Sequence, residues 1–216
     1  MNRDTTIVIA TRNRLVKLLN TLKTIPLADW ISVCVVCDDD EETFQYLRQY
    51  RPDVEAILTD SHIGSVACRN MAISKIDTHV LYATDDLLFR PQCIDRAMGS
   101  MREWFPDYDG VIGIKQEPGG YHPSGVALVG QPFLQRYPER QLFCPDYWHF
   151  SAHEVMWHAE AVERFHLEEG ATFWHLHPAK FKEEMDETHR EGRIHKDRDM
   201  ALIAERKNNN LIWGLR

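Results

Sequence analysis

The sequence predicts an α/β fold in which a mostly parallel central sheet is flanked by helices. Three observations support this fold class. Short apolar runs alternate with amphipathic helical patterns through the first hundred residues, polar residues gather just after the apolar runs, and 216 residues with 44% hydrophobic content can bury one substantial core. Because this length is short for two independently stable domains, we expect a single domain over residues 1–216.

The expected elements follow one another in order along the chain. A strand at 7–10 precedes a helix whose leucines recur at spacings of three and four, from Leu15 to Leu22. Further strands are expected at 31–37, 54–58 and 80–83, with helices at 41–50 and 64–76. Strand-like runs at 110–114 and 126–129 and a helix at about 153–165 follow. Residues 180–210 are highly charged and predict a peripheral helix, or a pair of helices broken near Gly192.

Composition excludes several classes of protein. Lys and Arg total 25 against 33 Asp and Glu, so the net charge of −8 argues against general binding of polyanions. Five cysteines, an odd number, lie mostly in apolar stretches, which favours reduced, buried thiols. The sequence has no apolar run of about 18 residues and no pattern of a secretory signal at its start. We therefore expect no membrane span and a cytoplasmic location.

Polar side chains follow the carboxyl ends of three predicted strands. They form three groups, which are Thr11, Arg12 and Asn13, then Asp38, Asp39 and Asp40, then Thr84, Asp85 and Asp86. In open α/β sheets ligands bind at this edge, so the pattern predicts a binding site. Carboxylates are suitable ligands for Mg²⁺ or Mn²⁺, which often complete their shell with water and substrate phosphates. Taken alone, two adjacent acids at a strand end are more often a solvated turn.

Four segments in succession carry a family resemblance. They are IVIATRNR at 7–14, VVCDDDEET at 35–43, GSVACRNMAIS at 64–74 and YATDDLLFRP at 82–91. Together they resemble the nucleotide-binding half of family 2 glycosyltransferases with the Rossmann-like GT-A fold. The resemblance covers about the first 95 residues and, more loosely, 153–178. It implies a nucleotide-sugar-binding half at 1–100, an acceptor and catalytic half at 101–178, and a peripheral helical segment at 179–216.

The resemblance assigns nucleotide-binding roles to particular positions. Thr11 and Arg12, with Asn13 beside them, match the loop that holds the nucleobase, and Asp38 matches the acid that binds the base or ribose. Arg69 and Asn70 match positions that approach the nucleotide. Asp85 matches the acid on the ribose side. A nucleoside diphosphate sugar, with UDP-sugar favoured, is the implied donor.

The resemblance also implies a metal ion, either Mn²⁺ or Mg²⁺. Asp86 matches the acid that binds the metal bridging the two phosphates, although Thr84 stands where the family's D-x-D motif usually begins with Asp. His175 and His177 would point to one face if FWHLHP were a strand. The resemblance makes one of them a contact to the metal or the diphosphate, and a hydrogen-bonded structural role is the alternative.

For the catalytic base, the segment at 149–170 resembles the family's acidic motif at the start of a helix. Glu154 falls at the position of the base, and Asp146 is the second candidate. A helix amino terminus favours the ionised carboxylate, which can then accept a proton from an acceptor hydroxyl. The alternative is that Glu154 is only an acid at a helix start.

These features together predict a metal-dependent glycosyltransferase that moves a sugar from a nucleoside diphosphate to an acceptor hydroxyl with inversion. A sugar nucleotidyltransferase is one alternative, but it normally has a Gly-rich basic loop where this chain has Thr11 to Arg14. A non-catalytic nucleotide-sugar-binding protein is the other. The acceptor stays open among a glycan, a small molecule, a protein and a nucleic acid.

Overall fold

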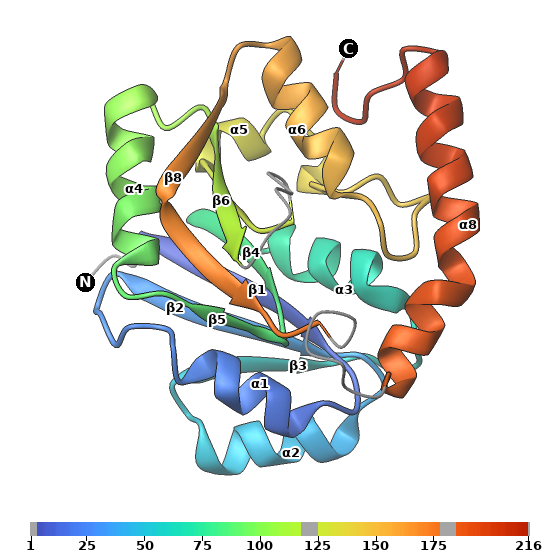
Figure 1. Ribbon diagram of the computed structural model, residues 1–216. Coiled ribbons are helices and arrows are strands. Elements are labelled where there is room, and N and C mark those ends of the chain that lie inside the picture. The colour runs from blue at the N-terminus through green and yellow to red at the C-terminus, as the bar shows by residue number, and fades with distance from the viewer. Residues whose placement is uncertain (1–3, 118–124, 178–184, 216) are drawn as a thin grey trace.

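The computed structural model describes residues 4–117, 125–177 and 185–215, and these form one sheet with helices on both faces (Figure 1). The eight strands have the order β3-β2-β1-β4-β7-β6-β8-β5. Four of the seven neighbouring pairs are parallel and three are antiparallel. The predicted fold class, an α/β fold with a mostly parallel sheet, is therefore confirmed.

The first half of the chain alternates strands and helices as predicted. Its strands are β1 (Thr5–Thr11), β2 (Ile31–Cys37), β3 (Val54–Leu58) and β4 (His79–Thr84), and its connecting helices are α1 (Leu15–Leu22), α2 (Glu41–Tyr50) and α3 (Gly64–Ile73). β2, α2 and β3 have the predicted bounds, whereas α3 ends three residues earlier than predicted. All four strands are parallel, so their carboxyl ends lie at one edge of the sheet.

The chain after β4 adds the antiparallel part of the sheet. It contains β5 (Leu87–Phe89), α4 (Cys93–Trp104), β6 (Val111–Glu117), β7 (Ala127–Val129), α5 (Gln131–Leu134), the 3₁₀ helix η1 (Pro138–Arg140), α6 (Ala152–Ala161) and β8 (Phe165–His175). The helix expected at 153–165 ends at Ala161. The chain then enters β8, a strand not predicted from the sequence, which lies between β6 and β5 and brings His175 to the sheet edge.

Alternating side chains of the strands build a core on each face of the sheet. In β1, Ile7 and Ile9 belong to a cluster that includes Leu18 of α1, whereas Val8 belongs to the cluster on the other face. That second cluster includes Val155 of α6 and residues of α3 and α5. Burial of each such side chain contributes about 1.5–3 kcal/mol, so the two clusters hold the strand ends in fixed positions.

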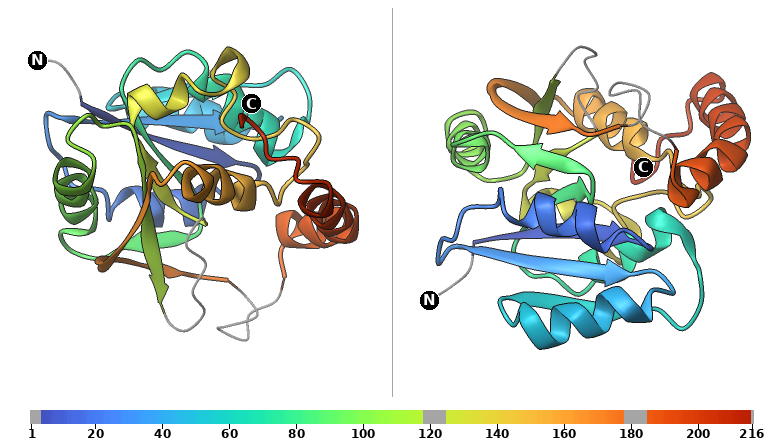
Figure 2. Two further views of the ribbon diagram at one scale, coloured as in Figure 1. Left: turned by 90° about the horizontal axis from the view of Figure 1, so that it is seen from above. Right: turned by 60° about the horizontal axis from the view of Figure 1, so that its bottom comes forward.

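The last helix, α8 (Glu187–Asn208), is continuous through Gly192, so the expected break there is wrong. Its buried residues include Ile203, which packs in the cluster around α3 and α6, and Asp186 caps its start by accepting from the backbone N–H of His189. Its first turns lie against the carboxyl ends of β1 and β4, as the views from above and below show (Figure 2). No helix in the described ranges is both long and apolar enough to cross a membrane.

Candidate functional site

A cleft of about 460 Å³ opens at the carboxyl ends of β1, β2 and β4. These strands are neighbours in register, with Thr11 opposite Cys37 and Ala10 opposite Thr84, so the residues that follow them lie along one edge. Most of the side chains assigned to the site from the sequence line this cleft. They are Thr11, Arg12, Asp38, Arg69, Asp85, Asp86, His175 and His177.

Two residues assigned to the nucleotide do not line the cleft. The backbone N–H of Asn13 donates to Asp40 at 2.7 Å, and the residue has a φ of 54°, so it shapes the loop after β1. The side-chain amide of Asn70 donates to the carbonyl of Phe143 and accepts from its N–H, at 2.7 and 3.0 Å. Asn70 therefore fixes the loop near Phe143 to α3, and both its amide nitrogen and its amide oxygen take part in that contact.

Both residues expected as the catalytic base also lie outside the cleft. Asp146 is exposed, with the thiol of Cys144 near its carboxylate. Glu154 is 1% exposed, and its carboxylate accepts from the hydroxyl of Tyr147, the guanidinium of Arg206 and the backbone N–H of Trp213. A base must lie within hydrogen-bond reach of the substrate proton. The structure therefore does not bring Glu154 to the position that this role requires.

Asp38 is built into the wall between β2 and α3. Its Oδ1 accepts from the N–H of Ile63 at 2.8 Å, and its Oδ2 accepts from the N–H of Gly64 at 2.9 Å. His62 Nδ1 lies 2.7 Å from the same Oδ2. The carboxylate thus holds the first turn of α3 against the end of β2, which shapes the side of the cleft where α3 begins.

Asp85 joins the loop after β1 to the end of β4. It accepts from Thr11 Oγ1 at 2.8 Å and from Arg14 Nη1 at 2.7 Å, and it is 3% exposed. Arg14 also approaches Asp86 at 3.4 Å. Burial alone lowers the pKa of Arg14, but the carboxylates of Asp85 and Asp86 outweigh burial and raise it. Arg14 is therefore a fixed positive charge behind the two acids, a role that the sequence pattern did not assign.

Asp86 lies between two imidazoles. His175 Nε2 is 3.3 Å from Oδ1, and His189 Nε2 is 3.3 Å from Oδ2. The ring of His177 lies 5.5 Å from that of His175 and 4.9 Å from that of His189, measured between centroids. Burial alone raises the pKa of Asp86, but the hydrogen bonds to His175 and His189 lower it well below its usual value. The carboxylate is therefore ionised at neutral pH.

The side chains of Asp86 and His175 suit a divalent cation that is also bound by a substrate. Within the described ranges, no three His, Cys, Asp or Glu side chains form a preformed metal cage. Mg²⁺ is commonly bound by one or two protein ligands plus substrate phosphates and water, and Mn²⁺ accepts both carboxylate and imidazole. Asp86 and His175 supply one carboxylate and one imidazole at adjacent positions. These residues fit the implied metal if a diphosphate provides the remaining ligands.

Arg69 of α3 supplies a buried positive charge at the cleft. It is 8% exposed, it stands over the ring of Phe143, and its Nε has no hydrogen-bond partner in the part of the chain that the structure describes. Burial lowers the pKa of Arg69. Because Arg69 also lines the cleft, its guanidinium is suited to pair with a phosphate bound there.

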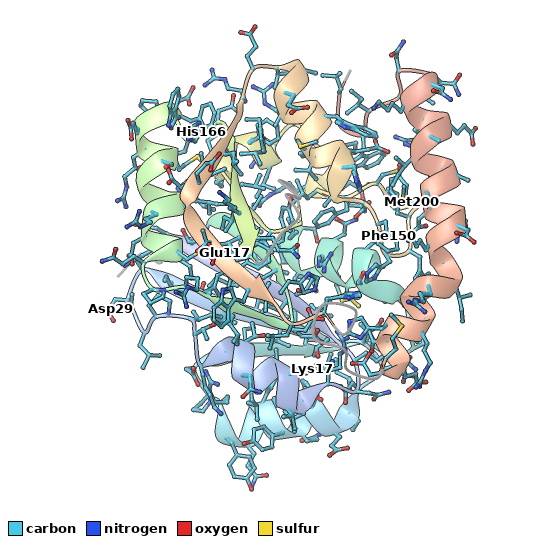
Figure 3. All side chains as sticks on the ribbon, in the orientation of Figure 1. Lys17, Asp29, Glu117, Phe150, His166 and Met200 are labelled. Atoms are coloured by element: carbon cyan, nitrogen blue, oxygen red, sulfur yellow. The ribbon has the colours of Figure 1, made fainter. Side chains whose placement is uncertain are left out.

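The start of α8 forms the outer wall of the cleft. Asp186 accepts from Arg14 Nε at 2.9 Å and from Lys17 Nζ at 2.8 Å. Lys17 belongs to α1 and is labelled in Figure 3 near the start of α8. Glu191 pairs with His62, and with Arg12 at 3.5 Å. The sequence indicated only a highly charged helical segment here. Because these partners lie more than 120 residues apart in the chain, spacing alone gave no sign of the wall.

An aromatic stack closes one end of the cleft. The ring of Trp148 stacks on His195 with centroids 4.6 Å apart and an interplanar angle of 25°, and it meets the edge of His62 at 5.3 Å. Gly64, with a φ of 84°, lies so close that an added Cβ would be 2.9 Å from the Trp148 ring. Glycine is thus needed both for its backbone conformation and for the approach of the indole.

The parallel strands, the antiparallel strands added to them and the cleft at the strand ends are the arrangement of the GT-A fold. Neither a family model nor a curated protein matches the sequence. Solved structures do match. The crystal structure of S. aureus TarS has a TM-score of 0.63 and 16% identity, over 82% of this chain and 62% of that chain. The same enzyme has also been solved in complex with UDP.

Two further solved structures share the architecture. The mannosyltransferase PcManGT from Pyrobaculum calidifontis, in complex with GDP-Man and Mn²⁺, matches with a TM-score of 0.63 and 14% identity, over 82% of this chain and 57% of that one. GalNAc-T7 with UDP, GalNAc and Mn²⁺ matches with a TM-score of 0.62 and 10% identity, over 80% and 43%. At this identity the likeness establishes the GT-A fold of the chain, which spans about two fifths to three fifths of the length of these proteins.

Proposed function

We propose that this chain is a glycosyltransferase that uses a nucleoside diphosphate sugar and a divalent metal ion. The observation that carries the proposal is the meeting of Asp85 and Asp86 with Thr11, Arg14 and Arg69 in one cleft. The cleft combines the ionised carboxylate of Asp86 for a cation with the buried guanidinium of Arg69 for a phosphate. That combination suits a metal-bound diphosphate better than it suits an uncharged sugar alone.

In this proposal different residues of the cleft bind different parts of the nucleotide-sugar donor. Thr11, Arg12 and Asp85 hold the nucleoside at the ends of β1 and β4, and Asp38 acts indirectly by shaping the first turn of α3. Arg69, which also lines the cleft, binds a phosphate oxygen. UDP-sugars are the donors to test first, and GDP-sugars and other nucleotides serve as comparisons.

Asp86 and His175 would hold Mn²⁺ or Mg²⁺, which when bound neutralises the charge that grows on the departing diphosphate. His189 and Arg14 contact the same carboxylate and keep it ionised and correctly oriented. The reaction is a displacement with inversion. The acceptor oxygen forms a bond to the sugar carbon as the bond from that carbon to the diphosphate oxygen breaks, and the electron pair leaves with the diphosphate.

The test is release of nucleoside diphosphate from a panel of donors with Mn²⁺, first with water as acceptor. Asp86→Asn is expected to lower turnover by at least about 100-fold, because it weakens the charge stabilisation of the transition state. Asp39→Asn is the matched control, since Asp39 is an exposed acid at a strand end that does not line the cleft. Equal turnover in wild type and Asp86→Asn, with both folded, would refute the metal role. Pyrophosphate release from a nucleoside triphosphate and a sugar phosphate would favour nucleotidyl transfer.

A further inference from the structure

A carboxylate on α8 holds the loop of Trp148, His149 and Phe150 by hydrogen bonds to its backbone. Asp199 is fully buried at 0% exposure, and it accepts from the backbone N–H groups of these three residues at 3.2, 2.8 and 3.0 Å. Phe150 accordingly lies beside α8 in Figure 3. A buried carboxylate that accepts from three successive backbone N–H groups fixes the loop strongly, because any movement of the loop would leave these buried polar groups without partners. The side chain of His149 is therefore held in one place.

His149 lines the cleft between α3 and α8. Its Nδ1 lies 3.3 Å from Ser65 Oγ, which also lies 3.5 Å from the carbonyl of Trp148. In the tautomer in which Ser65 donates to that carbonyl and accepts from Nδ1–H, the lone pair of His149 is on Nε2. Nε2 makes no hydrogen bond to any residue in the described ranges. Gly192 lies beside it, where a Cβ would approach Nε2 to 3.8 Å.

The charges that face His149 keep it neutral. Burial, and next the guanidinium of Arg69, lower the pKa of His149 from 6.5 to about 4. Arg14 acts in the same direction, whereas Asp199 and Asp86 oppose it. The imidazole is thus unprotonated at neutral pH, and its basicity is close to that of the carboxylate that usually serves as a base.

The other bases of the cleft are already engaged. Asp38 accepts from the N–H groups that begin α3, and Asp85 is bound to Thr11 and Arg14. Glu191 pairs with His62, and Asp86 with two imidazoles. Glu154 lies outside the cleft. By contrast, His149 keeps a lone pair that no described side chain uses.

We propose that His149 is the catalytic base of the transfer reaction and that Asp199 is a positioning residue that holds it. This inference rests on the proposed function. His149 Nε2 accepts the proton of the acceptor hydroxyl as the acceptor oxygen attacks the sugar carbon. The bond to the diphosphate oxygen breaks in the same step, the diphosphate takes the electron pair, and the proton later passes from the imidazole to solvent.

The test compares wild type with His149→Gln and His149→Ala in UDP release from UDP-sugars with Mn²⁺ and water as acceptor. His149→Gln is expected to lower kcat by about 100-fold or more, while the Kd for UDP, measured by calorimetry, changes less than threefold. Added imidazole is expected to restore part of the rate of His149→Ala in proportion to its concentration. A purely structural role would not give this rescue. His166→Gln, at the distant stack on Trp104, is the matched control and is expected to leave both values unchanged.

Asp199→Asn tests the positioning role. An amide nitrogen cannot accept from the loop N–H groups, so kcat is expected to fall about tenfold with little change in the Kd for UDP. If Asp199→Asn does not fold, Ser65→Ala replaces it, with the same expectation of a lower kcat at constant Kd. A kcat for His149→Gln within threefold of wild type, or a loss of UDP binding equal to the loss of rate, would overturn the inference and leave the proposed function intact. Wild type that neither binds UDP nor releases it would overturn both.

Discussion

The ion pair between Glu154 on α6 and Arg206 on α8 gives the most direct prediction about stability. The two side chains meet at 2.6 and 3.1 Å, and the same carboxylate accepts from Tyr147 and from the backbone N–H of Trp213. The Glu154 side chain is 2% exposed, against 15% for Arg206. Glu154→Gln removes the charge and turns one acceptor oxygen into an N–H₂ group that faces donors.

The cost follows from this burial. Removing one partner of a buried ion pair typically destabilises a protein by 3–5 kcal/mol, and we expect about 3 kcal/mol because water reaches part of Arg206. For a chain of this length each kcal/mol shifts Tm by roughly 2–4 °C, so the expected decrease in Tm is about 6–12 °C. Turnover of the folded variant at a temperature well below the transition is expected to stay within about twofold of wild type, because Glu154 does not line the cleft.

The assay pairs thermal unfolding, followed by circular dichroism, with UDP release at 20 °C. Glu160→Gln on the exposed side of α6 is the matched control and is expected to leave Tm unchanged within about 1 °C. Arg206→Met should cause a loss similar to that of Glu154→Gln, and the double variant should lose less than the sum of the two. An unchanged Tm combined with a 100-fold loss of turnover in Glu154→Gln would refute this reasoning and restore Glu154 as the base.

Two further predictions concern a glycine and a buried histidine. Gly64→Ala is expected to destabilise the protein by about 1–3 kcal/mol in urea unfolding and to weaken UDP binding, because the φ of Gly64 is 84° and the new methyl group meets Trp148. Gly99→Ala is the control and should cause no loss of stability, because a Cβ at Gly99 meets nothing within 4 Å. His158 is 1% exposed, and burial, followed by Arg136, lowers its pKa from 6.5 to about 4. Between these pH values the unfolded chain binds a proton that the folded chain does not, so the free energy of unfolding should fall as pH decreases from 6.5 to 4, by at most about 3 kcal/mol. His158→Asn should remove that part of the dependence, and an unchanged pH slope would contradict the assignment.

The parallel half of the fold could be predicted because its signals are local. Each strand from β1 to β4 is a short apolar run, and each following helix has apolar residues at helical spacing, so β2, α2 and β3 were predicted with the observed bounds. β8 was missed because the run Phe165–His175 contains two glutamates and Gly170 in place of an apolar alternation. The partner strand β6 shifts register at Ile114 and Lys115 opposite this polar stretch.

The candidate site was predicted best where it consists of strand ends. Thr11, Asp38, Asp85 and Asp86 follow parallel strands, and topology alone brings them to one edge. The contribution of α8 was not visible, because the pairing of Asp86 with His189 spans more than 100 residues of chain. Gly192 suggested a break in that helix, whereas α8 continues through it, and a Cβ at this position would meet the ring of His149 at an ordinary contact distance of 3.8 Å.

Glu154 shows that a residue assigned to the site from the sequence can lie outside it. An acid in the first turn of a helix is a sound signal for a base, but the sequence does not reveal that Arg206 and Trp213 lie against it. Long-range partners decide whether a carboxylate is free to act on a substrate or is committed to the fold. His149 could not be predicted for the same reason. It belongs to no distinctive motif, and its position depends on its contact with Ser65 and on the backbone hydrogen bond to Asp199.

The central claim is that the cleft beside Asp85 and Asp86 binds a nucleoside diphosphate. The most direct measurement is a crystal structure of the chain grown with UDP and Mn²⁺. We expect the diphosphate between Asp86 and Arg69, with the cation on Asp86 and His175 and the nucleoside at Thr11. Clear density for UDP at another surface, or an empty cleft at a UDP concentration that saturates binding in calorimetry, would contradict the account.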